Sequence, residues 1–256
     1  MEGKYCIVRF QWAGETRYGI VDRDDVFMVE GSIYDKFGIG HRLCNLSDVR
    51  LLSPIQPKNI IGVGGNYLSA VKQVGREVAK QPQLFSRPVS TVIGHLDNII
   101  YPKTSKIVNY GAELTIVIRS QVWNVPEDKA LDYVLGYTCG VDLTAFDLLQ
   151  EDGFRPFRAK AFPTSQPLGP CIATGIDGDN VGITSKLNGA VIEDGSTRDL
   201  IFNISKLVSY ISKYIVLEPG DVILTGQMKT TQINIGDTIV VEMEGIGALE
   251  NTVISG

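Results

Sequence analysis

Two acidic residues and one lysine stand in apolar stretches, where charged side chains are unexpected. Glu113 is the only carboxylate in "VNYGAEL", Asp142 ends the apolar run "VLGYTCGVD", and Lys160 stands between aromatics in "FRAKAF". Taken singly, each has an ordinary explanation as a solvated strand residue, a helix cap and a surface charge. If the three converge, two carboxylates and an ammonium group form a site for a hard cation or an oxyacid.

Strands are predicted around these residues. Alternation over 112–118 places Glu113, Thr115 and Val117 on one face of a half-buried strand, and a second strand over 134–141 ends on Asp142. The dipeptide Asn188-Gly189 predicts a hairpin, and two more strands are expected at 238–244 and 248–253.

The strongest helix signal begins at Ser196. Asp199 stands at capping-box spacing from it, and apolar residues then recur with helical spacing as far as Ile211. A shorter helix is predicted from Tyr67 to about Ala79, after the strand "IIGVG".

The chain divides into a small N-terminal β domain, residues 1–55, and a larger unit, residues 56–256, with the proline-containing segment "LLSPIQPKN" between them. A net charge of −5 without a Lys/Arg cluster argues against nucleic acid. No apolar run is long enough to span a membrane, and the N-terminus lacks a signal-peptide layout. We therefore expect a cytoplasmic protein with a small-molecule partner.

The order of segments resembles that of the fumarylacetoacetate hydrolase superfamily over nearly the whole chain. The matching blocks include "NIIGVGGNY", "LFSRPVSTVIG", "VNYGAELTIVI", "GYTCGVDLTAFDL", "RAKAFPTSQPLGP", "LEPGDVILTG" and "IGDTIVVEMEGIGALENTV". The resemblance implies an α+β, β-rich fold: a mixed β-roll with a small N-terminal β domain, usually in a homodimer.

The resemblance also implies a metal site that is incomplete here. Active members typically carry two glutamates and a later aspartate that bind Mg²⁺ or Mn²⁺, and the matching positions are Gly111, Glu113 and Asp142. Lys160 matches the catalytic lysine. With one carboxylate lost, we expect weak metal binding, which a glutamate at Gly111 should strengthen if the strand accepts a side chain there. Proximity of the three charged groups is expected to depress the carboxylate pKa values and keep the lysine charged.

Further residues are assigned to substrate binding by the same resemblance: Asn66, Tyr67, Gln73, Arg87, Glu193, Thr197, Thr225 and Gly226. The His-Ala-x-Glu dyad of members that cleave or decarboxylate is absent, since this chain has "AVKQ" from Ala70 to Gln73. Loss of a general base typically costs about 10²–10⁴ in rate, so ordinary C–C hydrolysis is not expected.

Three functions remain open. The first is an enzyme that acts on a 2-oxo or β-dicarbonyl acid through an enolate, by tautomerisation, decarboxylation or C–C cleavage, with Lys160, Glu113 and Asp142 as catalytic residues. The second is a metal-independent isomerase or cyclase with a new acid/base set that includes Glu193 or Lys229. The third is a catalytically silent protein that binds a ligand or a partner.

Overall fold

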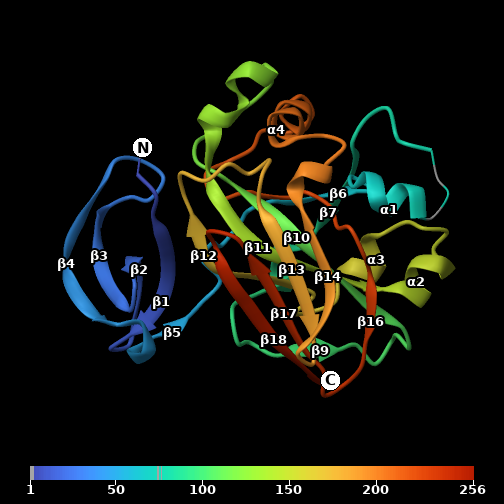
Figure 1. Ribbon diagram of the computed structural model, residues 1–256, viewed down its shortest axis with the longest axis horizontal. Helices are drawn as coiled ribbons and strands as arrows, with labels where there is room; N and C mark the ends of the chain where they lie inside the picture. The colour runs from blue at the N-terminus through green and yellow to red at the C-terminus, as the bar shows by residue number, and fades with distance from the viewer. Residues whose placement is uncertain (1–2, 74, 76) are drawn as a thin grey trace.

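The computed structural model describes residues 3–73, 75 and 77–256, and the chain is rich in strands as the sequence predicts. A 13-stranded sheet has the main order β4-β3-β2-β1-β12-β11-β10-β15-β6-β7, with β5, β8 and β16 paired off this path to β1, β12 and β10. A 5-stranded sheet has the order β14-β13-β17-β18-β9 (Figure 1). Antiparallel pairs dominate, but β15 with β6, β12 with β8 and β18 with β9 are parallel. The fold is therefore mixed, as expected.

The N-terminal strands form a curved layer at the left of Figure 1. They are β1 (Cys6–Trp12), β2 (Glu15–Asp22), β3 (Asp25–Gly31), β4 (Phe37–Asn45) and β5 (Arg50–Leu51). Strand β1 pairs with β12, with Cys6 opposite Ala173 and Ile7 opposite Ile172. This layer therefore continues into the larger sheet through a single ladder.

The larger sheet is completed by strands from the rest of the chain. They are β6 (Ile60–Gly64), β7 (Gln83–Arg87), β8 (Val92–Ile93), β10 (Val108–Ile118), β11 (Val134–Ala145), β12 (Gln166–Ala173), β15 (Val222–Leu224) and β16 (Thr231–Ile233). Strand β10 lies between β11 on one side and both β15 and β16 on the other.

The second sheet contains β9 (Ile99–Tyr101), β13 (Gly182–Leu187), β14 (Ala190–Ser196), β17 (Thr238–Met243) and β18 (Gly247–Ser255). The Asn188-Gly189 hairpin is confirmed, because these two residues join β13 to β14 and both have positive φ, at 51° and 80°.

The helices are short. They are α1 (Leu68–Gln73), α2 (Phe146–Glu151), α3 (Phe157–Lys160) and α4 (Ile204–Ser212), with 3₁₀ turns η1 (Leu46–Asp48), η2 (Val89–Thr91), η3 (Glu127–Tyr133) and η4 (Thr197–Asp199).

The prediction that a helix runs from Ser196 is wrong about its start. Ser196 caps only the 3₁₀ turn η4, and α4 begins after Asn203, whose side chain accepts a hydrogen bond from the Lys206 backbone N–H. The backbone between Ser196 and Asn203 makes a different contact, since Leu200 forms an isolated antiparallel β-bridge with Tyr67. A tertiary contact therefore overrides the local helical pattern.

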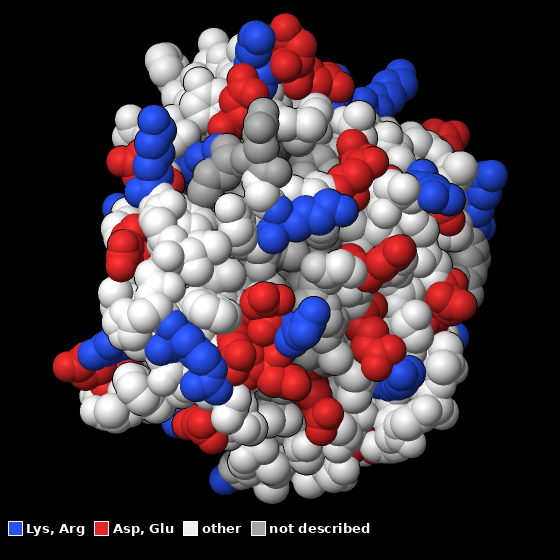
Figure 2. All heavy atoms as spheres, turned by 60° about the vertical axis from the view of Figure 1, so that its left-hand side comes forward, with Lys and Arg blue, Asp and Glu red and all other residues white. Residues whose placement is uncertain are grey.

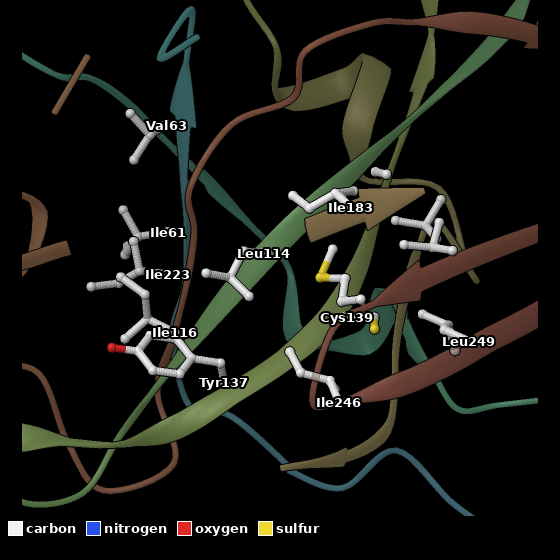
Figure 3. Packing of buried hydrophobic residues seen from close by; sticks show 14 of the residues in the cluster. Ile61, Val63, Leu114, Ile116, Tyr137, Cys139, Ile183, Ile223, Ile246 and Leu249 are labelled. Atoms are coloured by element: carbon white, nitrogen blue, oxygen red, sulfur yellow. The ribbon is translucent and has the colours of Figure 1, made fainter. Parts of the chain in front are cut away.

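The hairpin of β10 and β11 forms the centre of the molecule. Apart from Asn109, both strands are buried along their whole length, so the expectation of a half-buried strand is wrong. Leu114 and Ile116 pack in one apolar cluster with Cys139 and Ile183 (Figure 3), whereas Val117 packs in a second one. Strand β11 also continues to Ala145, which places Asp142 within the strand instead of at its end.

On the face shown in Figure 2, acidic and basic side chains are interspersed, and acidic ones gather near the centre. The described residues of this face therefore form no continuous basic patch of the kind that binds nucleic acid. Within the described ranges, no helix is long and apolar enough to cross a membrane.

Candidate active site

Glu113, Asp142 and Lys160 converge, although 47 positions separate the first from the last. Asp142 pairs with Gly111 in the β10–β11 ladder, which puts it beside Glu113 on the same face. Lys160 ends α3 and donates hydrogen bonds from Nζ to the Asp142 carboxylate and, at 2.7 Å, to Thr144 Oγ1. All three charged residues are buried, with exposed fractions of 1%, 2% and 7%.

Arg87 supports this cluster from behind. Its side chain is fully buried and donates to Asp142 Oδ1 and the Leu143 carbonyl at 2.7 Å, and to the Ser165 carbonyl at 2.8 Å. A fourth hydrogen bond goes to Gln166 Oε1. These partners orient Asp142, which favours a positioning role for Arg87 over the direct substrate contact that the sequence suggests.

The electrostatics differ from the expectation at Glu113. Burial, and then the negative charge of Asp142, raise the pKa of Glu113 to about 8, so the predicted depression is wrong for this carboxyl group. Burial also acts to raise the pKa of Asp142, but the neighbouring Lys160 and Arg87 charges hold it below its usual value. Burial lowers the pKa of Lys160 despite its ion pair. Near neutral pH the cluster therefore combines a protonated acid with an ion-paired one.

A loop after β15 closes over Glu113. Strand β10 pairs with β15 at residues 115–117 and with β16 at residues 108–110, so the ladder is interrupted alongside residues 111–114. Thr225 fills part of this gap, since its backbone N–H and its Oγ1 both donate to the Leu114 carbonyl, at 3.0 and 2.9 Å. Gly226, with φ at +101°, donates its N–H to Glu113 Oε2 at 2.8 Å. The loop thus reaches the site through its backbone.

Gln227 is the site residue that the sequence reasoning missed. A Cβ added at Gly111 would lie 2.5 Å from Gln227 Cδ and closer still to Oε1, so the amide fills the space beside Gly111. Its Oε1 is buried and has no hydrogen-bond partner among the described residues. The strand therefore does not accept a side chain at Gly111 unless Gln227 moves. The paired signals were available as "YGAEL" and "LTGQMKT", but only the fold brings them together.

Two predicted substrate-binding residues, Asn66 and Thr197, form hydrogen bonds to backbone groups of distant segments. The Asn66 side chain is fully buried, donates to the Phe202 and Thr225 carbonyls and accepts from the Phe202 N–H. Thr197 is also buried, and its Oγ1 accepts from the Val181 N–H at 2.8 Å. These contacts give both residues a structural role.

Two other predicted substrate-binding residues, Tyr67 and Glu193, each have a polar atom without a partner among the described residues. The Tyr67 hydroxyl and Glu193 Oε1 are buried without a hydrogen-bond partner in the part of the chain that the structure describes. Burial raises the pKa of Glu193 to about 7 and raises that of Tyr67 as well. The side chain of Gln73 lies outside the described residues.

The oxygen atoms around Gly111 are of the chemical type that hard divalent cations bind. Glu113 and Asp142 are carboxylates on one face of the hairpin, and the orphaned amide oxygen of Gln227 lies against the same face. Over the described ranges, no group of three or more His, Cys, Asp and Glu side chains lies together. The negative charge available to a cation is therefore smaller than three carboxylates would supply.

The chain is similar in sequence and in structure to several known enzymes. A mitochondrial oxaloacetate tautomerase of Xenopus laevis is 33% identical over 221 residues, which cover 81% of this chain and 69% of the relative. A solved 2-hydroxyhepta-2,4-diene-1,7-dioate isomerase from Mycobacterium marinum is similar over 98% of both chains, with 30% identity and a TM-score of 0.91.

A solved fumarylpyruvate hydrolase from Pseudomonas aeruginosa, in complex with Mn²⁺ and pyruvate, covers 81% of this chain and 92% of its own, with 26% identity and a TM-score of 0.73. Residues 7–54 match the family described as Rv2993c-like, N-terminal. Residues 59–254 match the one described as Fumarylacetoacetate (FAA) hydrolase C-terminal. The chain belongs to the fumarylacetoacetate hydrolase family.

Proposed function

We propose that the protein transfers a proton next to a carbonyl group of a small 2-oxo or β-dicarbonyl acid and so interconverts its keto and enol forms. The observation that carries this proposal is the buried Lys160 ammonium. Among the described residues it has two hydrogen-bond partners, Asp142 and Thr144, and Nζ also lies 4.8 Å from the centroid of the Phe85 ring, so the third N–H can turn from that ring to a substrate oxygen. Burial lowers its pKa, which brings proton exchange closer to neutral pH.

Lys160 acts on both reacting atoms in this proposal. Its amine form accepts the proton from the carbon next to the carbonyl, and the C–H electron pair forms the new C=C bond while the carbonyl oxygen becomes an enolate. The resulting ammonium stabilises that oxygen and then returns the proton to it. Asp142 and Thr144 hold Nζ in place throughout.

Glu113 and Asp142 would hold Mg²⁺ or Mn²⁺ weakly. A bound divalent ion would supply positive charge that orients the oxygen atoms of a 2-oxo acid. Two features weaken the site: the proton on Glu113 must leave before the ion binds, and Asp142 is already paired with Lys160 and Arg87.

Two of the three relatives described above support proton transfer, whereas the third is named as a hydrolase. Two are named as a tautomerase and an isomerase, reactions that move a proton without activating water. The chain has Ala70 and Gln73 in place of the dyad that its family resemblance associates with cleavage. The substrate class, the weak metal site and a homodimeric assembly belong to this proposal.

A second candidate is a metal-independent isomerase that uses Glu193, and the observation in its favour is a buried carboxyl group with an unpartnered oxygen and a pKa of about 7. A rise in melting temperature with oxaloacetate in the presence of a chelator would favour this candidate over the first.

The first candidate is tested with Lys160→Met and Lys160→Arg, measured by the rate of keto–enol interconversion of oxaloacetate with Mg²⁺. We expect both variants to lose at least about 10²-fold in rate, since methionine has no proton and a guanidinium does not release one. Both should stay folded because Arg87 still pairs with Asp142. The exposed Lys103→Met serves as the control. A Lys160→Arg protein with near-wild-type rate would reduce the role of Lys160 to charge alone, and a fully active Lys160→Met would refute the proposal.

A further inference from the structure

Gln227 lies beside Gly111, the position on strand β10 that has no side chain. Its amide fills the space beside Gly111, and Gly111 is the direct ladder partner of Asp142. Directly opposed residues have Cβ atoms about 4.5–5.5 Å apart, so the amide lies within reach of the Asp142 carboxylate. Glu113 follows two residues after Gly111 on the same strand face. One face of the hairpin thus gathers two carboxylates and an amide.

The Gln227 oxygen lacks a partner in that position. Its Oε1 is buried without a hydrogen bond from any described residue, and an unsatisfied buried acceptor is unfavourable. Asp142 is ionised and can only accept, and the proton of Glu113 is shared with Asp142, so neither carboxyl group donates to the Gln227 oxygen. The described hydrogen bonds of Lys160 go to Asp142 and Thr144. A cation bound between the three oxygen-bearing groups would give the Gln227 oxygen a partner.

The loop geometry holds Gln227 in this place. The preceding Gly226 has a positive φ that L side chains rarely adopt, and its N–H is bonded to Glu113. Thr225 is tied to the Leu114 carbonyl at two points. The backbone that carries Gln227 is therefore anchored to the strand that carries Glu113.

We propose that Gln227 supplies the third protein oxygen of the divalent cation site, from a loop, in place of a carboxylate on the strand at position 111. This inference rests on the proposed weak binding of Mg²⁺ or Mn²⁺ by Glu113 and Asp142. Both ions accept amide oxygens as ligands. The exchange keeps the number of protein ligands and removes one negative charge.

The experiment measures Mn²⁺ affinity of the full-length protein by calorimetry, and by the electron paramagnetic resonance signal of free Mn²⁺, at pH 8. The variants are Gln227→Glu, Gln227→Leu and, as a matched control, Gln121→Leu, which removes an exposed glutamine bonded to Glu218. We expect Gln227→Glu to bind Mn²⁺ at least tenfold more tightly and Gln227→Leu at least tenfold more weakly. The control should stay within twofold of wild type.

A double variant guards against misfolding of the loop. Gly111→Glu with Gln227→Gly moves the ligand back to the strand and clears the space it needs, so it should bind Mn²⁺ more tightly than wild type. The inference is overturned if Gln227→Leu binds like wild type, or if Gln227→Glu fails to improve affinity while its melting temperature is unchanged. If wild type binds no Mn²⁺ at millimolar concentration, the proposed metal site fails together with this inference.

Discussion

At the scale of single residues, the protonation of Glu113 should govern metal binding. Its pKa of about 8 means that a proton must leave before the carboxylate can bind a cation. We expect the apparent Mn²⁺ affinity to rise about tenfold per pH unit between about pH 6 and pH 8 and to level off above pH 8. Calorimetry in buffers of different ionisation enthalpy should show the release of about one proton at pH 7.

Glu113→Gln provides the contrast. This variant has no proton to lose, so its affinity should be weaker at pH 8 and nearly independent of pH over the same range. A wild-type affinity that does not change from pH 6 to pH 8 would mean that Glu113 is ionised before the metal arrives, or that it is not a ligand.

Individual residues also mark the limit of what sequence can predict. Glu113, Asp142 and Lys160 could be found because each charge interrupts an apolar stretch, and the structure brings them together. The direction in which the pKa of Glu113 shifts could not be predicted, since it depends on how completely the hairpin is buried on both faces. Gln227 could not be singled out either, because a glutamine in a loop is ordinary until its contact with Gly111 is known.

At the scale of elements, the turn at Gly226 should be essential to the site. Its φ of +101° is strained for any other residue, and an added Cβ would meet Asn66 Cβ at 3.0 Å and the Val63 carbonyl at 3.2 Å. We expect Gly226→Ala to lower the free energy of unfolding by roughly 1–3 kcal/mol or more. It should also weaken Mn²⁺ binding, because the N–H that orients Glu113 moves.

Gly236→Ala is the matched control for this turn. Gly236 has a similar φ of +94°, but nothing lies within 4 Å of an added Cβ. It should therefore lose only the stability that the backbone strain costs and leave Mn²⁺ affinity unchanged. Equal effects of the two substitutions in urea denaturation and in calorimetry would show that the crowding at Gly226 is relieved without consequence for Glu113.

The strand pattern was the part of the element structure that sequence predicted well. Period-2 alternation and the Asn188-Gly189 turn locate β10, β13 and β14 because they depend on neighbours along the chain. The start of α4 was misplaced because Leu200 and Phe202 contact Tyr67 and Asn66, more than 130 positions away. No local pattern carries such information.

At the scale of the whole molecule, the N-terminal strands should unfold together with the rest. Ile7 of β1 packs in one apolar cluster with Val117, Leu168 and Ile172 of the larger unit. Ile7→Ala should therefore cost about 2–5 kcal/mol and lower the midpoint of a single transition. The exposed Ile39→Ala, on β4, should cost far less.

The two tryptophans allow this to be measured. Trp12 lies in β1 and Trp123 lies beyond β10, so Trp12→Phe and Trp123→Phe each leave one reporter. Coincident urea midpoints of the two reporters are expected. An earlier transition at Trp12 would mean that residues 1–55 form an independently stable domain, a division that stays a prediction, as does the homodimer.

The interrupted ladder beside residues 111–114 has an evolutionary consequence. Strands β15 and β16 keep their own registers with β10 on either side of the gap, and Thr225 and Gly226 anchor the loop, so residues 227–230 can be exchanged without shifting either pairing. A duplicated gene can therefore acquire a new ligand or a new substrate contact in four positions while the acid-bearing strand stays fixed. If Gln227 takes the place of a carboxylate at position 111, relatives with an acid at that position should carry a small residue at position 227, since the two side chains compete for one space.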